Sequence, residues 1–157
     1  MQGYAYKSDT EPPVVESRAG LQLRSYMDGI RGARLFPTES EIDPDALHKI
    51  WDYCFLVSID PVARHAGYRY SYLGQKLIEV CGDNLHNSDI AVHLISTTTT
   101  HLKANFDEVL RTQQAVIDEN EFVNVKRLNV KYRVSLFPLG SDDNITHIIG
   151  CMRWRIY

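Results

Sequence analysis

Tyrosines at alternate positions, followed closely by a glycine, are the residues of this chain best suited to ligand chemistry. Tyr68, Tyr70 and Tyr72 lie in the segment YRYSYLGQKLIEVCGDNL, residues 68–85. Because alternate side chains of an extended strand share one face, we expect the three rings to point the same way. A tyrosine combines an apolar ring with one hydroxyl that donates and accepts hydrogen bonds. The segment therefore predicts a surface that orients a mostly apolar small ligand.

The six histidines do not form a recognisable metal-binding pattern. No His-x-x-x-His spacing with a carboxylate and no Cys-x-x-Cys pair occurs, and these spacings are typical of zinc sites. His93 and His101 are eight positions apart, but we do not expect one continuous helix between them. The sequence therefore predicts no metal site.

The three cysteines are expected to be free thiols. Cys54, Cys81 and Cys151 are odd in number and widely spaced, and the first twenty residues lack the apolar segment of an export signal. This combination favours a reducing cytoplasm. No serine or cysteine has a base at a spacing typical of nucleophilic catalysis, and the nine glycines do not gather into a phosphate-binding loop.

Acid/base catalysis is the enzyme alternative that the residues leave open. A small cone-shaped enzyme of the ketosteroid-isomerase type needs an acid poised inside an apolar pocket. Asp118, Glu119 and Glu121 are the candidates, but beside Asn120 and without periodic burial they read as loop charges. A binding module is therefore favoured, and we expect no enzyme.

Charge and hydropathy exclude two other classes of partner. The chain has 17 basic and 20 acidic residues and a net charge of −3, which argues against general nucleic-acid binding. No apolar run approaches the length of a membrane span. A local basic patch on the outer face of a sheet could still hold an anionic ligand or an acidic partner, although charges on a wet strand face are ordinary. Its members would be Lys126, Arg127, Lys131, Arg133, Arg153 and Arg155.

Two short antiparallel strands and a helix are expected to position the tyrosines. The apolar run 54–59 ends at Asp60-Pro61 and reads as a buried strand. Its connection to the tyrosine strand is too short for a crossover helix, so the two strands pair antiparallel. A short helix follows Gly74, and Gly82 is its expected terminator. Another turn or two of helix is expected over 88–95.

A longer helix and three strands are expected to complete the domain. Leu102, Phe106, Val109 and Leu110 form the apolar stripe of a helix over 97–113 that must lie on the sheet. Apolar and polar residues then alternate over 128–136, turn residues gather at 140–144, and a last strand covers 146–156. One or two short strand pieces are expected within 115–125.

The N-terminal part has weaker signals. Residues 1–23 are polar with a proline pair, and we expect them to be disordered. A helical segment is expected over 24–35, although Gly29 and Gly32 weaken it. Asp43-Pro44 predicts the start of a helix that places Ala46, Leu47, Ile50 and Trp51 on one face.

Three segments in this order resemble a bacterial family of PAS-like domains, the PAS-5 type. They are RLFPTESEIDPDALHKIWDYCFLVSID, the tyrosine segment YRYSYLGQKLIEVCGDNL, and FPLGSDDNITHIIGCMRW, and the resemblance covers about residues 25–155. The chain departs from the family pattern at Ser71 and Asn87. The resemblance implies a cytoplasmic, stand-alone sensory or protein-interaction domain.

The fold expected from pattern and resemblance is α+β and PAS-like, with five antiparallel strands, helices inserted after the second strand, and an N-terminal helical extension. We expect a tail over 1–23 and the domain over 24–157. The expected function is sensing, by binding a small ligand, a protein partner or both, and a homodimer paired through the segment 26–35. The candidate pocket residues are Tyr70, Tyr72, Leu77, Phe106, Leu110, Tyr132 and Trp154; a filled core without a cavity is the alternative.

Two cofactors of PAS proteins can be weighed against the sequence. Haem would need a histidine on or near the long helix, and His93 and His101 are the positions available. Flavin photochemistry of the light-sensing kind needs a cysteine within Asn-Cys-Arg-Phe, but Cys81 lies between Glu79-Val80 and Gly82-Asp83. We therefore expect a haem sensor only as an alternative and no flavin photochemistry.

Overall fold

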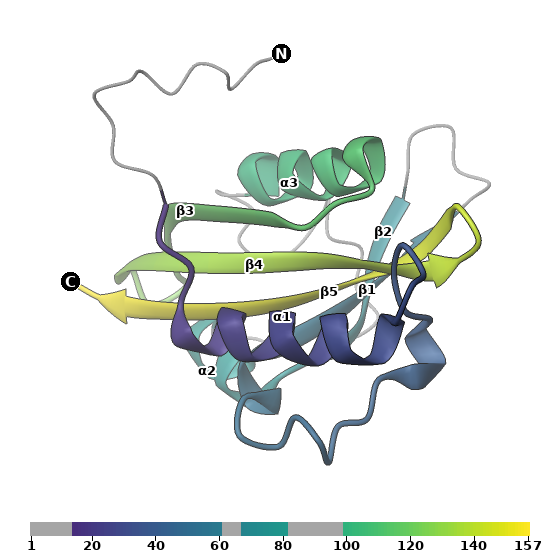
Figure 1. Ribbon diagram of the computed structural model, residues 1–157. Helices are drawn as coiled ribbons and strands as arrows, with labels where there is room; N and C mark the ends of the chain where they lie inside the picture. Colours follow the sequence, from purple (N-terminus) through teal and green to yellow (C-terminus); the bar gives the residue numbers. More distant parts are fainter. Residues whose placement is uncertain (1–13, 61–66, 82–98) are drawn as a thin grey trace.

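Five antiparallel strands form one sheet in the order β2-β1-β5-β4-β3 (Figure 1). The structure is a computed structural model that describes residues 14–60, 67–81 and 99–157. The strands are β1 (Cys54–Asp60), β2 (Gly67–Leu73), β3 (Val116–Val123), β4 (Asn129–Ser141) and β5 (Asn144–Ile156). The helices are α1 (Arg18–Arg31), α2 (Gln75–Cys81) and α3 (Thr99–Thr112), with 3₁₀ turns η2 (Glu39–Glu41) and η3 (Trp51–Tyr53). The predicted strand count, antiparallel pairing, N-terminal helix and helices after the second strand are confirmed.

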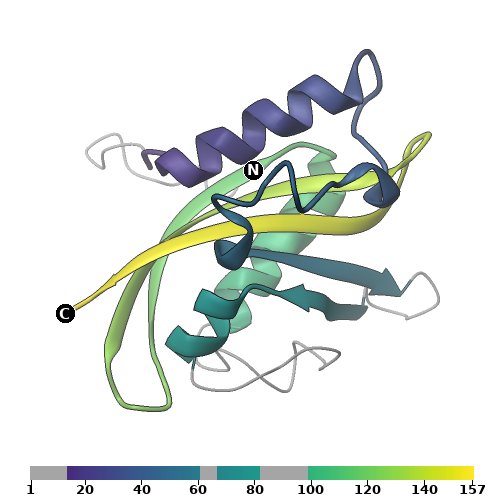
Figure 2. The same cartoon turned by 90° about the horizontal axis from the view of Figure 1, so that it is seen from below.

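Helices cover both faces of this sheet. Figure 2 shows α1 on one side and α2 and α3 on the other. β4 and β5 are 13 residues long and pair along their whole length, so their alternating side chains supply two separate apolar clusters. None of the helices in the described part of the chain is long and apolar enough to cross a membrane.

We call the cluster between the sheet and helices α2 and α3 the inner cluster. It consists of Phe55, Val57, Tyr68, Tyr70, Leu73, Leu77, Val80, Cys81, Leu102, Phe106, Val109, Phe122, Val130, Tyr132, Val134, Leu136, Ile148 and Met152. The outer cluster lies beneath α1 and consists of Ala19, Leu23, Met27, Leu47, Ile50, Cys54, Leu56, Phe137, Leu139, Ile149 and Cys151.

A β-bulge overturns the prediction that the three tyrosines of β2 share a face. Leu56 pairs with Tyr72, whereas the next residue of β1, Val57, pairs with Tyr70, so Ser71 is the extra residue. An extra residue in one strand reverses the faces of everything beyond it. Tyr72 therefore packs against the outer cluster, where its ring stacks on Trp51 at a centroid distance of 4.4 Å.

Helix α1 begins earlier than the sequence analysis predicted. Residues 18–23 belong to it, although they were expected to lie in a disordered tail that ended at residue 23. Ser17 is the N-cap, because its side chain accepts a hydrogen bond of 3.0 Å from the Gly20 N–H. Glu16 holds the same end by accepting hydrogen bonds from Arg24 and from the Ser135 hydroxyl, at 2.8 and 2.7 Å. Ser135 is consequently buried, although it is one of the polar residues that alternate with apolar ones along this strand.

The prediction that a helix begins at Asp43-Pro44 is wrong. Residues 44–50 form successive turns in which the N–H groups of Ala46, Leu47 and His48 donate to carbonyls three residues earlier. Leu47 and Ile50 are buried in the outer cluster as the pattern indicated, while Ala46 is exposed. Three-residue steps place these two side chains on the sheet without a regular α-helix.

The C-terminal strands agree with the predicted alternation but differ in length. β3 is one continuous strand that contains Asp118, Glu119 and Glu121, which were expected to be loop charges. β4 and β5 run into the predicted turn, so only Asp142 and Asp143 separate them. The described part of the long helix, α3, buries the predicted Leu102, Phe106 and Val109. The predictions for Gly82, residues 88–95 and His93 lie outside the described residues.

The contact between α1 and β4 generates a prediction at Gly20. A Cβ at Gly20 would overlap the Ser135 Oγ, whereas a Cβ at Gly29 on the same helix would have no heavy atom within 4 Å. Alanine favours a helix over glycine by about 1 kcal/mol. We expect Gly29→Ala to raise the free energy of unfolding by about that amount, and Gly20→Ala to lower it by about 1–3 kcal/mol because of overpacking.

Urea unfolding of both variants measures this difference. Because the two substitutions are chemically identical and lie in one helix, opposite signs isolate the contact with Ser135. Equal stabilisation by both alanines would contradict the close approach of α1 to β4.

Candidate functional site

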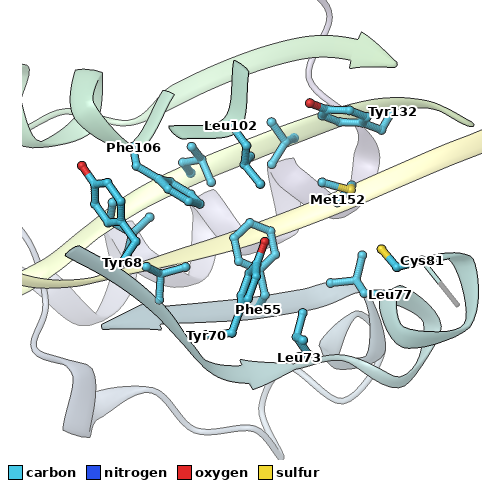
Figure 3. Packing of buried hydrophobic residues seen from close by; sticks show 14 of the residues in the cluster. Phe55, Tyr68, Tyr70, Leu73, Leu77, Cys81, Leu102, Phe106, Tyr132 and Met152 are labelled. Atoms are coloured by element: carbon cyan, nitrogen blue, oxygen red, sulfur yellow. The ribbon is translucent and has the colours of Figure 1, made fainter. Parts of the chain in front are cut away.

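The inner cluster is where most of the predicted pocket residues lie (Figure 3). Tyr70, Leu77, Phe106 and Tyr132 are buried within it, brought together from β2, α2, α3 and β4. Leu110 and Trp154 pack at its margin. Tyr72 does not belong to this group, because the bulge turns it to the other face.

Two tyrosine hydroxyls inside the inner cluster are unusual. The Oη atoms of Tyr70 and Tyr132 are buried and have no hydrogen-bond partner among the described residues. Both residues are 1% exposed. A buried polar group without a partner lowers the free energy of unfolding by about 1–3 kcal/mol. A bound water, ion or ligand can supply the missing hydrogen bond. These two oxygens are therefore the chemical feature of the cluster that packing alone does not explain.

The rings of these tyrosines are held in place by other aromatic rings. Phe55 contacts Tyr70 edge to face at 5.9 Å between centroids, and Phe122 contacts Tyr132 at the same centroid distance. Figure 3 shows the Tyr70 ring beside Phe55 in the middle of the cluster. Because the rings are fixed, the hydroxyls occupy defined positions and are not free to turn towards solvent.

Electrostatics keep both hydroxyls protonated. Burial raises the pKa of Tyr70 well above its ordinary value, and Cys81 and Tyr132 lie close enough to raise it further. Burial also raises the pKa of Tyr132, with a smaller contribution from the Asp118 carboxylate. Burial raises the pKa of the Cys81 thiol to about 12. All three groups are neutral at physiological pH, and each carries a proton that it can donate.

The other tyrosines of β2 provide a contrast. The Tyr68 hydroxyl donates to the Asp107 carboxylate on α3, and the Tyr72 hydroxyl donates to the Trp51 carbonyl oxygen at 3.0 Å. Three tyrosines at alternate positions of one strand thus have different roles. Tyr68 connects the sheet to α3, Tyr72 connects it to η3, and Tyr70 is left without a described partner.

The candidate acids and histidine lie outside the inner cluster or at its edge. Asp118 accepts a hydrogen bond of 2.9 Å from Asn105, the Glu119 carboxylate is 3.4 Å from Arg133, and Glu121 accepts from the Tyr157 hydroxyl. His101 is exposed at the start of α3. Among the described residues, no group of three or more His, Cys, Asp or Glu side chains could hold a metal ion.

Asn124 was not predicted as a structural residue, and it fixes the position of α2. Its amide nitrogen donates to the Val80 carbonyl oxygen at 2.9 Å. Its side-chain oxygen accepts from the Lys126 and Leu128 N–H groups at 3.0 and 2.9 Å. One side chain therefore closes the β3–β4 turn and bonds the last turn of α2. An asparagine in a turn predicts the local bonds, but only the tertiary fold gives the bond to α2.

Asn124→Ala tests this connection. We expect it to lower the free energy of unfolding by about 1–3 kcal/mol, because the Val80 carbonyl and two N–H groups lose their partner. The matched control is Asn129→Ala, since the Asn129 side chain is exposed and should change stability by less than about 0.5 kcal/mol. Urea unfolding measures both variants, and equal effects would contradict the role of Asn124.

Solved structures of similar fold include a photoreceptor variant, a light-oxygen-voltage domain and a light-oxygen-voltage receptor. A variant of the photoreceptor Vivid has a TM-score of 0.51 and 11% identity, covering 92% of this chain and all of that chain (100%). A light-oxygen-voltage domain studied with a flavin analogue has a TM-score of 0.50 and 10% identity, covering 71% of this chain and 82% of its own. An RNA-binding light-oxygen-voltage receptor has a TM-score of 0.51 and 14% identity, covering 74% of this chain and 35% of that chain. At these identities the likeness shows the fold alone.

The described inner cluster does not fit a flavin. A flavin ring has a polar edge with several hydrogen-bond donors and acceptors, which burial requires to be satisfied. Among its described members, the cluster offers the Tyr70 and Tyr132 hydroxyls and the Cys81 thiol, because the Tyr68 hydroxyl already donates to Asp107. The sequence around Cys81 also lacks the Asn-Cys-Arg-Phe motif of light-sensing relatives.

The family itself follows from the sequence. Among curated proteins no sequence matches this chain. A family model, PAS_5, described as a PAS domain, matches residues 15–153. That match includes α1, strands β1 to β4 and β5 as far as residue 153. This chain therefore belongs to the PAS-5 family of PAS domains.

Proposed function

We propose that this PAS domain is a sensory module that binds a small neutral molecule between the sheet and helices α2 and α3. The observation that carries the proposal is the pair of buried hydroxyls, Tyr70 and Tyr132, without a described partner. A ligand that accepts hydrogen bonds from both would satisfy them. The PAS fold and family support the sensory role.

The chemistry of the inner cluster narrows the class of ligand. Leu102, Phe106 and Met152 are buried around the hydroxyls, so most of the ligand surface would be apolar. A charged ligand would need a buried counter-ion, and the described members of the cluster include no charged side chain. The ligand would therefore be uncharged, with carbonyl or hydroxyl oxygens as its polar groups.

Signalling would proceed by a shift between arrangements of the helices that cover the cluster. Leu77 and Cys81 project from α2 towards the interior (Figure 3), so a ligand there contacts α2 directly. A ligand favours whichever arrangement it binds more tightly. The surface that α2 and α3 present to a protein partner would change with it.

Pairing of two copies remains part of the proposal. Leu23 and Met27 of α1 are buried against the chain's own sheet, while Leu21 and Leu35 are 51% and 59% exposed. The apolar surface left for a partner near α1 therefore includes these two leucines. Light scattering across a concentration series measures the mass, and a monomer throughout would remove the homodimer. Cytoplasmic location stays a prediction.

The haem and acid/base alternatives gain no support from the described residues. His101 is exposed and does not reach the inner cluster. Asp118, Glu119 and Glu121 each have a partner at the surface or at the edge of the cluster. Absence of enzyme activity stays an expectation.

Phenylalanine substitutions test the ligand site. In protein that retains its ligand, Tyr70→Phe and Tyr132→Phe should each weaken ligand binding by about 1 kcal/mol or more, because a hydrogen bond is lost. In ligand-free protein the same changes should raise the free energy of unfolding, because an unsatisfied buried hydroxyl disappears. The matched control is Tyr68→Phe, which loses the bond to Asp107 and should destabilise both forms.

Native mass spectrometry and urea unfolding provide the measurements. A molecule that co-purifies with the wild-type chain and is lost from the Tyr70→Phe and Tyr132→Phe variants supports the site. If no molecule is retained and both variants are as destabilised as Tyr68→Phe, the hydroxyls already have partners in the protein and the proposed ligand site is wrong.

A further inference from the structure

Four cations form a block on the α1 side of the sheet, on the opposite face from the inner cluster. Lys131 and Arg133 of β4 stand directly opposite Arg155 and Arg153 of β5, respectively. Like charges directly opposite each other destabilise a sheet, so this arrangement lowers stability unless nearby carboxylates compensate the charge. We call these four residues the basic groove. Lys126 and Arg127, predicted to belong to the patch, lie in the turn before β4 instead.

Carboxylates on the neighbouring strand compensate only half of this charge. On β3, Glu119 stands opposite Arg133 and Glu121 stands opposite Lys131. Each row across β3, β4 and β5 therefore contains one carboxylate and two cations. No ion pair joins Arg153 or Arg155 to a carboxylate of the described residues. Two positive charges remain in excess.

The arginine side chains of the groove are supported from the side. The Arg153 guanidinium lies over the Tyr53 ring at 4.1 Å from the centroid, and Arg133 bonds Glu119 and the Val15 carbonyl oxygen. A guanidinium stacked on a ring keeps its N–H edge available for an anion. Less side-chain entropy is then lost when an anion binds.

A surface hollow of about 200 Å³ joins these cations to the start of α1. The four cations line it together with Glu119 and with Ser17, the N-cap of α1. The N-terminus of a helix carries partial positive charge. The helix dipole and the excess arginine charge therefore act on the same small volume.

The size and charge of the hollow indicate its ligand. One guanidinium group can donate two parallel hydrogen bonds to two oxygens of the same phosphate. Facing Cα atoms of the two strands are about 5 Å apart, and residues two apart along a strand about 7 Å, so the block can contact two adjacent phosphoryl groups. The hollow is smaller than the roughly 300–1,000 Å³ that holds a drug-sized molecule. We propose that the basic groove binds a diphosphate group, as inorganic diphosphate or as the end of a nucleotide.

Titration of the full chain with inorganic phosphate, inorganic diphosphate, AMP and ADP tests this proposal. Calorimetry of each titration measures the affinity. We expect diphosphate and ADP to bind at least about tenfold more tightly than phosphate and AMP, because only they engage both rows of cations. Equal affinity for diphosphate and ADP assigns the site to the diphosphate alone, and tighter ADP binding assigns it to a nucleotide.

The variant Arg153→Gln with Arg155→Gln removes the excess charge. The matched control, Lys126→Gln with Arg127→Gln, removes the same charge from the nearby turn. We expect the first pair to weaken diphosphate binding about tenfold or more and the second to change it less than about twofold. Urea unfolding confirms that the first variant folds, since loss of like-charge repulsion should not destabilise it.

Three results would overturn the proposal. The first is that neither diphosphate nor ADP binds at millimolar concentration. The second is that both double variants lose the same amount of affinity for diphosphate. The third is that an RNA oligonucleotide binds more tightly than diphosphate and loses the same affinity in both variants. The last two would indicate diffuse attraction to positive charge. Loss of the ligand site at Tyr70 and Tyr132 leaves this proposal untouched, because the groove lies on the other face of the sheet.

Discussion

The alternation of side chains along β4 and β5 is the constraint on which the rest of the structure depends. Both strands bury residues on both faces, so Tyr132 and Met152 belong to the inner cluster while Phe137 and Cys151 belong to the outer cluster. A one-residue slip of register would exchange every side chain between the two clusters. This pairing determines where the helices lie. The apolar side of α1 packs on the outer cluster, and the apolar sides of α2 and α3 pack on the inner cluster.

The parts of the fold that could be predicted are those fixed by local pattern. Alternation over β4 and the stripe of α3 are properties of consecutive residues, and both predictions are confirmed. The bulge at Ser71 results from the pairing of β2 with β1, which no local pattern of β2 contains. The prediction of a helix over residues 44–50 is wrong for a related reason. Their helical spacing is real, but turns suffice to bury Leu47 and Ile50, so tertiary packing overrides the propensity.

The candidate site also has features that the sequence predicts and features that only the tertiary structure gives. Alternation alone places Tyr70 and Tyr132 on an inward face, and their burial could be predicted. Their missing hydrogen-bond partners could not, because that depends on which groups the helices bring to them. Tyr68 shows the difference, since α3 supplies Asp107 to it. Likewise the basic residues of β4 and β5 are visible in the sequence, but the register decides that Lys131 faces Arg155 and that Glu121 faces Lys131.

Tyr53 connects the two proposed sites physically. Its ring lies 5.5 Å from the Trp154 ring, which packs at the margin of the inner cluster, and it supports the Arg153 guanidinium on the opposite face. Trp154 and Arg153 are consecutive in β5, so they project to opposite faces. A ligand in the proposed inner site that moved Trp154 would also change the support of Arg153. For two such proposed sites, linkage would require that diphosphate in the basic groove change the affinity of the inner cluster for its ligand by the same factor.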